Sequence, residues 1–600
     1  MEKEEVPTPE TRGSAPVSED HEHVERVPTH LSVEDFKWDI DIITNLAALY
    51  VVFFASTWML IVPSSIIGFI TEAFPTESDK SVWIATAITI SNCVLSSFVG
   101  LLSDILGRKV FVLVGMVLGL IGTLVSSRAH GMEQVIGGQV LSGCGLTIGY
   151  LAIALTQEIV PKDKRPITQA ITAVAAGIAT IIGPIIGGAF IKHEVGGVNN
   201  GWRGPFYLGA GFFAIAFITT LFFYNPGPRP NPEGLPIRTR LAKVDWLGVF
   251  LVAAGLTLFL VGLFYGGNPD KWTSGRVLGP LIVGAVLLIA FGLYEWKGTS
   301  TGLLAHILFK HRNFPISLSL NFVGGIVLFG GQAFLPQEII QLYTSDAVLT
   351  GVDNLPFSIS AVVGGALLFV AFIFTKNAKP ITIVSLAIII LGSGLMCVME
   401  PHINYAAWFF PTALLGLSVG LQTAVVPLIV SVCTPNHAIG TAIMISNSAR
   451  SFGGSIGTVI FQQIFAHKIK AILPKKVIPA VLKAGLPQTS LPSLLEAFAA
   501  QSQALIVQVP GFTPAIYAAL VRAAGKAYAD SFRYIWYALL AFACACTILS
   551  FFLENTTLMM THEVAVQVEH GHHHINPLHH EHHEHGHPEN KHDPLHKEEV

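Results

Sequence analysis

Fourteen long apolar runs constrain the fold of this chain more than any other feature of its sequence. Each run holds about 18 residues or more, which is enough for a helix to cross the hydrocarbon core of a bilayer. Only 12% of the residues are charged, about half the share expected in a soluble chain. We therefore predict an all-α membrane protein with 14 transmembrane helices. The runs are residues 43–70, 82–102, 109–127, 133–157, 168–191, 205–224, 245–265, 277–296, 314–336, 355–375, 381–399, 406–431, 439–466 and 533–553.

The basic residues of the short loops predict the orientation of these runs. If the runs alternate in direction, fourteen Lys and Arg residues lie in loops on one side and six on the other. Because cytoplasmic loops are enriched in Lys and Arg, we place both termini in the cytoplasm. The polar first forty residues show no cleavable signal peptide. We expect a multi-pass monomer in the lipid bilayer of the plasma membrane, with the vacuolar membrane as an alternative.

A short charged turn joins the second and third runs. It reads Gly100-Leu-Leu-Ser-Asp104-Ile-Leu-Gly107-Arg108-Lys109, so the two helices must form a tight hairpin whose Arg-Lys pair marks the cytoplasmic side. The stretch resembles the loop signature G-x-L-x-D-x-x-G-R-K of the major facilitator superfamily. That resemblance implies a transporter in which Asp104, Arg108 and Lys109 pin the inner ends of neighbouring helices and stabilise one conformation.

A glycine-proline segment in the fifth run is the second motif. Gly183-Pro184-Ile-Ile-Gly187-Gly188 combines small residues, which let helices approach closely in lipid, with a proline that bends a helix. Taken alone, such a segment is more often an ordinary kinked packing helix. Because it lies in the fifth run of a chain that also has the charged turn between its second and third runs, the segment resembles the antiporter signature of drug:proton exchangers.

Further segments carry the resemblance from about residue 40 to residue 560. Gly201-Trp202-Arg203 and Asp245-Trp246-Leu247-Gly248, which precede the sixth run and open the seventh, resemble fourteen-span drug:proton antiporters. Within that group, Ile136-Gly-Gly-Gln139 and Gln157-Glu158-Ile-Val-Pro161 are most similar to fungal trichothecene efflux pumps. Siderophore transporters share the long loop before the last run and are the nearest competitor.

The runs are arranged as six, two and six. The predicted parts are a disordered cytoplasmic N-terminal tail (1–40), an N-terminal six-helix bundle (41–224), a cytoplasmic linker (225–243), an inserted helix pair (244–297), a C-terminal six-helix bundle (314–553) and a His-rich cytoplasmic tail (554–600). The second bundle contains a long extracellular loop, 467–532. Its amphipathic stretches 493–507 and 514–530 predict helices lying over the extracellular mouth, or a surface cap without a role in transport.

Ionisable and amide side chains inside the runs are candidates for the path of a substrate or a proton. An ionisable group in a membrane is costly and usually functional, whereas a buried glutamine often only links helices. Many proton-coupled relatives carry an arginine where this chain has Gln139. The scattered amides and aromatic residues suit a neutral or weakly polar organic molecule. The candidates are Trp58, Gln139, Gln157, Glu158, Gln337, Glu338, Asp353, Asn447 and Arg450.

The tail holds thirteen histidines between His562 and His596. Neutral imidazole binds zinc, copper or nickel, but a low-complexity tail with adventitious metal affinity is the favoured interpretation. The weak metal-binding candidates are His572, His573, His574, His579, His580, His582 and His583.

The resemblance implies proton-coupled efflux of a toxin, drug or secondary metabolite, with the proton gradient as driving force, and we expect no bound cofactor. Siderophore-iron uptake is the alternative, and a non-transporting sensor that reads metal through its tail is a third hypothesis. The net charge of −4 gives no reason to expect a nucleic-acid partner. No nucleophile–base pair, metal framework or phosphate loop occurs at recognisable spacing, so we do not expect an enzyme.

Overall fold

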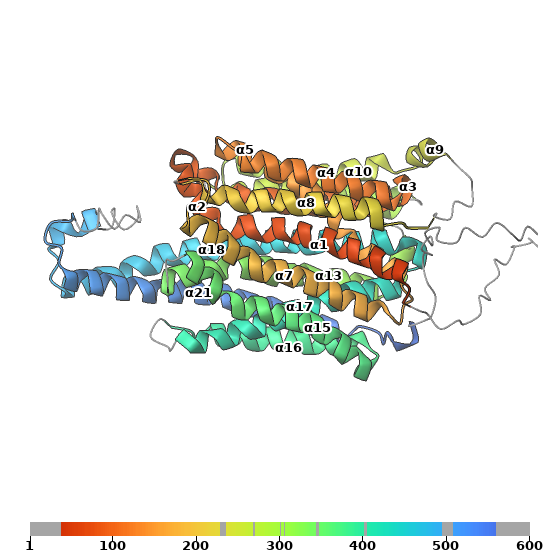
Figure 1. The fold of residues 1–600 in the computed structure, drawn as a ribbon. Coiled ribbons are helices and arrows are strands. Elements are labelled where there is room, and N and C mark those ends of the chain that lie inside the picture. Colours follow the sequence, from red (N-terminus) through yellow and green to blue (C-terminus); the bar gives the residue numbers. More distant parts are fainter. Residues whose placement is uncertain are drawn as a thin grey trace, which may run out of the picture. The chain divides into compact units, whose positions relative to one another are not determined.

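The computed structural model describes residues 38–197, 199–227, 236–267, 270–299, 302–304, 306–343, 347–400, 405–494 and 508–559. Apart from isolated bridge positions, such as that between Gly266 and Asp270, the regular structure of these residues is helical (Figure 1). The long helices are α1 Ile40–Ser65, α3 Val82–Leu106, α4 Arg108–Ser127, α5 Met132–Tyr150, α7 Arg165–Lys192, α8 Gly204–Phe223, α10 Trp246–Tyr265, α11 Gly275–Leu293, α13 Asn313–Leu342, α15 Leu355–Thr375, α16 Ala378–Met396, α17 Tyr405–Cys433, α18 Ile439–Lys483 and α21 Pro514–Ser550. The short ones are α2 Ile67–Ala73, α6 Ala152–Ile159, α9 Ile237–Ala242, α12 His306–Phe309 and α14 Ala347–Asp353.

Thirteen helical segments of the described residues are long and apolar enough to cross a membrane. The one predicted span that is not among these thirteen, 439–466, corresponds to α18, which packs against α3, α13 and α21 as a member of the bundle. Its buried first half is rich in polar side chains, which explains why it is less apolar than the others: Thr441, Ser446, Asn447, Ser448, Ser451 and Ser455. The all-α membrane fold predicted from the sequence is confirmed.

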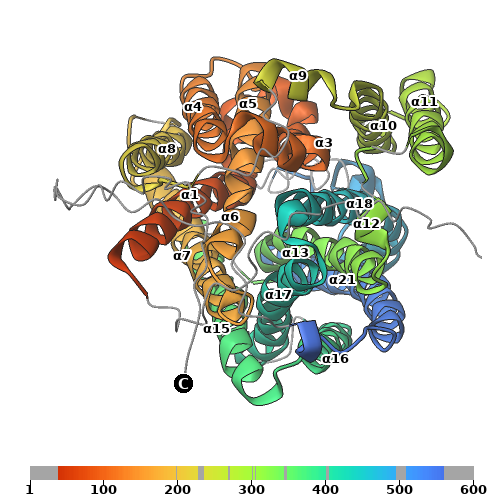
Figure 2. The ribbon, with the colours of Figure 1, turned by 90° about the vertical axis from the view of Figure 1, so that its right-hand side faces the viewer.

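The helices form two bundles with a seam between them (Figure 2). In the first bundle α1 packs on α7 and α8, and α4 packs on α5 and α8. Small residues permit this close packing: a Cβ atom on Gly145 of α5 would lie only 2.5 Å from the Cα of Gly119 in α4. In the second bundle α17 packs on α15 and α16, while α21 packs on α13, α16 and α18.

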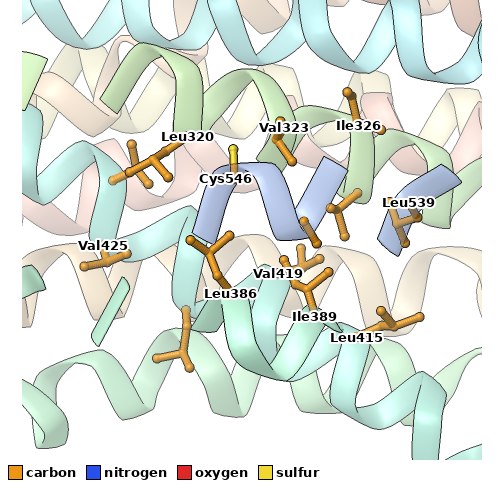
Figure 3. Close-up of a cluster of buried hydrophobic side chains, with 14 of the residues drawn as sticks. Leu320, Val323, Ile326, Leu386, Ile389, Leu415, Val419, Val425, Leu539 and Cys546 are labelled. Atoms are coloured by element: carbon orange, nitrogen blue, oxygen red, sulfur yellow. The ribbon is translucent and has the colours of Figure 1, made fainter. Parts of the chain in front are cut away.

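The second bundle has a continuous apolar core. Figure 3 shows side chains from α13, α16, α17 and α21 meeting in it, among them Val323, Ile389, Val419 and Leu539. Each of these is less than 10% exposed, so the four helices are held as one body. Such a core favours rigid movement of the bundle over bending within it.

The inserted pair α10 and α11 lies at one edge of the seam, beside both bundles (Figure 2). Helix α10 packs on α11, on α3 of the first bundle and on α18 of the second. Phe259 of α10 contacts Phe452 of α18 with ring centroids 5.8 Å apart, and Gln463 of α18 donates to the Gly266 carbonyl at 2.9 Å. The insertion therefore touches the two bodies at one interface.

The segment 467–532 differs from the predicted loop. Residues 467–483 continue α18 and residues 514–532 belong to α21, so the two membrane helices extend together past the ends of the others (Figure 1). The expectation of separate helices lying over the mouth is wrong for 514–530; most of 493–507 lies outside the described residues. The extensions have their own small apolar core, which replaces lipid as the partner of their buried faces: Val477, Val481, Leu486, Leu494, Val509, Ile516, Leu520, Ala523 and Ala524.

Candidate functional site

A buried charge cluster joins α3, α4 and α6. Arg108 is 4% exposed, and its Nη2 lies 2.7 Å from Asp104 Oδ1 and 2.5 Å from Glu158 Oε1. Its Nη1 donates to Ser103 Oγ. Gly107 makes the turn between α3 and α4 with φ of 95°, a conformation that favours glycine. The turn thus points one guanidinium at two carboxylates in a site that water scarcely reaches.

The two bundles are in close contact at this end of the seam, which we call the Arg108 end. A Cβ atom on Gly100 would lie 2.7 Å from the Cα of Thr441, and the Thr441 hydroxyl donates to Asp104 Oδ2 at 3.5 Å. Arg165, fully buried at the start of α7, donates from Nη1 to the Ser431 carbonyl at 2.7 Å. Lys109, the last residue of the charged turn, instead donates to Asn225 Oδ1 within the first bundle.

Amide and hydroxyl groups join α3 to α18 further along the seam. Asn92 donates to Ser451 Oγ at 2.8 Å, and Asn447 donates to Asn92 Oδ1 at 3.1 Å and to Ser96 Oγ at 2.9 Å. All four side chains are buried. Because these hydrogen bonds are few and join uncharged groups, the two helices can separate without leaving a buried charge unpaired.

A second polar chain crosses the seam between α6, α7, α17 and α18. Arg450 donates to Thr423 Oγ1 at 2.7 Å, and Gln169 donates to the Thr423 carbonyl at 3.4 Å. Gln157 then donates to Gln169 Oε1 at 2.7 Å, and Arg165 donates to the Gln157 carbonyl at 3.0 Å. The predicted candidates Gln157 and Arg450 are therefore parts of one interface network.

A pocket opens between the bundles toward the opposite end, which we call the Ser65 end. Its volume is about 710 Å³, part of it open to solvent. The lining comes from α1, α2 and α7 of the first bundle and from α13, α14 and the start of α15 of the second. The residues are Ile61, Ser64, Ser65, Ile66, Phe69, Thr180, Pro184, Gly188, Pro336, Ile340, Thr350, Gly351 and Asn354.

The glycine-proline motif of α7 serves two faces. A Cβ atom on Gly183 would lie 2.6 Å from a methyl group of Val62 in α1, and one on Gly187 would lie 3.1 Å from a methyl group of Ile66, the residue after α1, so these glycines let α7 approach α1. Pro184 and Gly188, one position further on, line the pocket. The motif thus shapes one wall of the pocket while it sets the spacing between two helices.

The comparisons with known proteins match this geometry. A model described as the fungal trichothecene efflux pump family (TRI12) matches residues 32–588. The chain belongs to this family. Its solved relatives in fold include the proton:xylose symporter XylE bound to 6-bromo-6-deoxy-D-glucose, with a TM-score of 0.52 and 12% identity over 87% of this chain and 98% of that one. At that identity the likeness shows the major facilitator fold alone.

Several fungal transporters resemble this trichothecene-pump family protein in sequence. The aspyridones efflux protein of Neocamarosporium betae is 26% identical over 67% of this chain and 70% of its own length. Efflux pump dotC of Dothistroma septosporum is 26% identical over 80% of this chain and 79% of its own length. The MFS transporter L2 of a Phoma species is 25% identical over 66% of this chain and spans 64% of that relative.

The remaining candidate residues of this family member are not gathered at one point. Trp58 packs inside the first bundle, donating to the Pro205 carbonyl at 3.1 Å. Gln139 is buried in α5, and neither polar atom of its amide has a hydrogen-bond partner among the described residues. Gln337 is exposed and Asp353 is buried at the end of α14. Their roles stay predictions.

Glu338 lies apart from the seam, in the second bundle near the Ser65 end. It is 2% exposed, and Trp536 of α21 donates from its indole nitrogen to Glu338 Oε2 at 3.1 Å. Among the described residues it makes no ion pair within 4.0 Å, in contrast to Glu158, which is bound to Arg108.

No group of three or more His, Cys, Asp or Glu suited to a metal occurs in the part of the chain that the structure describes. The seven histidines proposed as weak metal ligands lie outside the described residues. Sequence reasoning missed Asn92, Arg165 and Asn354, because a single polar residue in an apolar run carries no local signal of its partner.

Proposed function

We propose that this chain exports a neutral organic secondary metabolite across the fungal plasma membrane in exchange for protons. The observation that carries the proposal is the uncharged pocket at the seam, combined with the close contact of the two bundles at the Arg108 end. By the distribution of basic residues in the loops, the Arg108 end faces the cytoplasm. The described conformation then corresponds to one that faces outward.

Alternating access follows from this arrangement. The two bundles rock about the seam, so that contacts at the Arg108 end break while the Ser65 end closes around the emptied pocket. Helices α3 and α18 must slide or separate along the Asn92–Asn447 bonds during this movement. One of its relatives is named as an aspyridones efflux protein. That name supports a metabolite as the substrate that this chain exports.

Transport into inside-out plasma-membrane vesicles tests the proposal. A labelled trichothecene and a panel of labelled fungal polyketides are offered, with and without an acidic lumen. We expect uptake that depends on the chain and on the pH gradient and that a protonophore abolishes. Vesicles from cells without the chain are the control. Uptake of ferric siderophore by whole cells, with no gradient-driven uptake of metabolites in vesicles, would contradict the proposal and favour import.

Glu338→Gln is expected to uncouple transport from the proton gradient. Glutamine keeps the shape of the side chain and still accepts the Trp536 indole hydrogen, but it cannot take up and release a proton. A buried carboxylate without a cation partner is the type of group that exchanges protons inside a membrane protein. Gradient-driven uptake should therefore fall to the level without a gradient, while exchange of labelled for unlabelled substrate persists.

The matched control is Glu133→Gln, because the Glu133 side chain is 79% exposed and only pairs with Lys80 at the surface. It should leave both assays unchanged. If Glu338→Gln keeps full gradient-driven uptake, Glu338 does not carry the proton.

A further inference from the structure

We propose that the pocket at the Ser65 end binds molecules through their hydroxyl donors, so that its ligand is a neutral, mostly apolar molecule bearing several O–H groups. The inference deepens the proposed export function and rests on it for the identity of the cargo. It follows from the state of the hydrogen-bonding groups in the lining.

The hydroxyl groups that line the pocket from the first bundle already donate their hydrogens to backbone carbonyls of their own helices. Ser64 donates to the Leu60 carbonyl at 3.0 Å and Ser65 to the Val62 carbonyl at 2.8 Å, both within α1. A hydroxyl has one hydrogen and two lone pairs. Once the hydrogen is bound to the helix, the oxygen that remains is an acceptor.

Thr180 of α7 repeats this arrangement. Its Oγ1 donates to the Ala176 carbonyl at 3.0 Å, one turn earlier in the same helix. Because α7 packs on α1, the three oxygens belong to one wall of the pocket, and each is available as an acceptor. The wall offers little to a ligand that itself only accepts hydrogen bonds.

The second bundle adds an acceptor that has no partner. Asn354 precedes α15, and its Oδ1 is buried without a hydrogen-bond partner among the described residues. An unsatisfied buried carbonyl is unfavourable in the empty pocket, and a ligand donor that reaches it removes that cost. A ligand hydroxyl is therefore favoured at Asn354 in particular.

The rest of the lining disfavours charged ligands. Among the described residues no Asp, Glu, Lys, Arg or His lines the pocket, and the rest of its lining consists of Thr350 and of Ile, Phe, Pro and Gly residues. An anion would lose its hydration without meeting a Lys, Arg or His side chain, and a cation would lose its hydration without meeting a carboxylate. A neutral ring system carrying hydroxyl groups can pack against the apolar side chains and donate hydrogen bonds to the acceptor oxygens.

A pair of stilbenes tests the proposal on the purified full-length protein in lipid nanodiscs. The probes are resveratrol, which carries phenolic hydroxyls, and its fully O-methylated ether, which has the same skeleton without donors. The ether partitions better into lipid, so a preference for resveratrol is not explained by partitioning. We expect resveratrol to bind about tenfold tighter or more, because groups built to accept hydroxyls reject analogues that lack them.

Two variants place the preference in this pocket. Asn354→Leu removes the unpaired acceptor, and Thr180→Val replaces the Oγ1 acceptor by a methyl group of the same size. Each should lower the preference for resveratrol about threefold to tenfold, the range expected for one hydrogen bond. Ser319→Ala is the control, since Ser319 is exposed on α13 and its hydroxyl also donates to its own helix.

Equal or tighter binding of the methyl ether overturns the inference, as does a preference that neither folded variant alters. The outcome is separate from that of the export assay. Gradient-driven uptake of metabolites without a preference for donors refutes only the pocket chemistry. A preference for donors without uptake of any metabolite refutes only the export function.

Discussion

Replacing Arg108 with glutamine is expected to lower transport at least about tenfold and to lower the melting temperature of the purified protein. The substitution removes the guanidinium that binds both Asp104 and Glu158, two carboxylates of one buried site. Removing one partner of a buried charge pair costs about 3–5 kcal/mol. The repulsion also displaces the Asp104 carboxylate, which accepts a hydrogen bond from Thr441 of the second bundle at the Arg108 end. Vesicle uptake and thermal unfolding in detergent measure the two effects.

Asp104→Asn separates the effect of charge from that of size. It leaves one guanidinium bound to one carboxylate, Glu158, and should therefore reduce transport less than Arg108→Gln does. Lys109→Gln serves as the neighbouring control, because Lys109 only donates to Asn225 at an exposed position. If Asp104→Asn is the more damaging of the two buried substitutions, charge balance does not govern this cluster.

The sequence predicts this cluster better than the rest of the seam. Asp104 and Arg108 lie one helical turn apart in sequence, so their pairing is local and a motif reports it. Glu158 was recognisable as a rare carboxylate in an apolar run, but its bond to Arg108 requires α6 and α4 to be adjacent. Asn92 and Asn447 are 355 residues apart. Neither has a neighbour in sequence that indicates a partner on the other bundle.

The helical extension of α18 and α21 shows a different limit. Pro474 and Pro479 lie inside α18, and prolines usually end a helix, so the sequence indicated a loop. The helix persists because its apolar stripe, including Val477 and Val481, packs against Leu520 of α21. A tertiary partner outweighs the local preference here. An amphipathic pattern alone does not tell whether that partner is another helix or a membrane surface.

A disulfide between Cys93 and a cysteine introduced by Ser448→Cys is expected to stop transport reversibly. Ser448 Oγ donates to the Cys93 carbonyl at 2.7 Å, and Cys93 Sγ lies 3.7 Å from the Ser448 carbonyl. The two side chains thus share one gap between α3 and α18, within the reach of a disulfide. If the bundles rock about the seam, a covalent bond between these helices holds the chain in one state. An apolar oxidant should abolish vesicle uptake, and a reductant should restore it.

The variant that combines Ser448→Cys with Cys93→Ser is the matched control, since it keeps the introduced thiol and removes its partner. It should transport equally with and without oxidant. A protease site inserted between α8 and α9 reports the cross-link directly, because Cys93 and residue 448 then lie on different fragments that only the disulfide holds together. Transport at the full rate by cross-linked protein would mean that α3 and α18 move as one body. The seam would then have to open between other helices, with α7 and α17 the next pair to join, since Gln169 already bonds to the Thr423 carbonyl there.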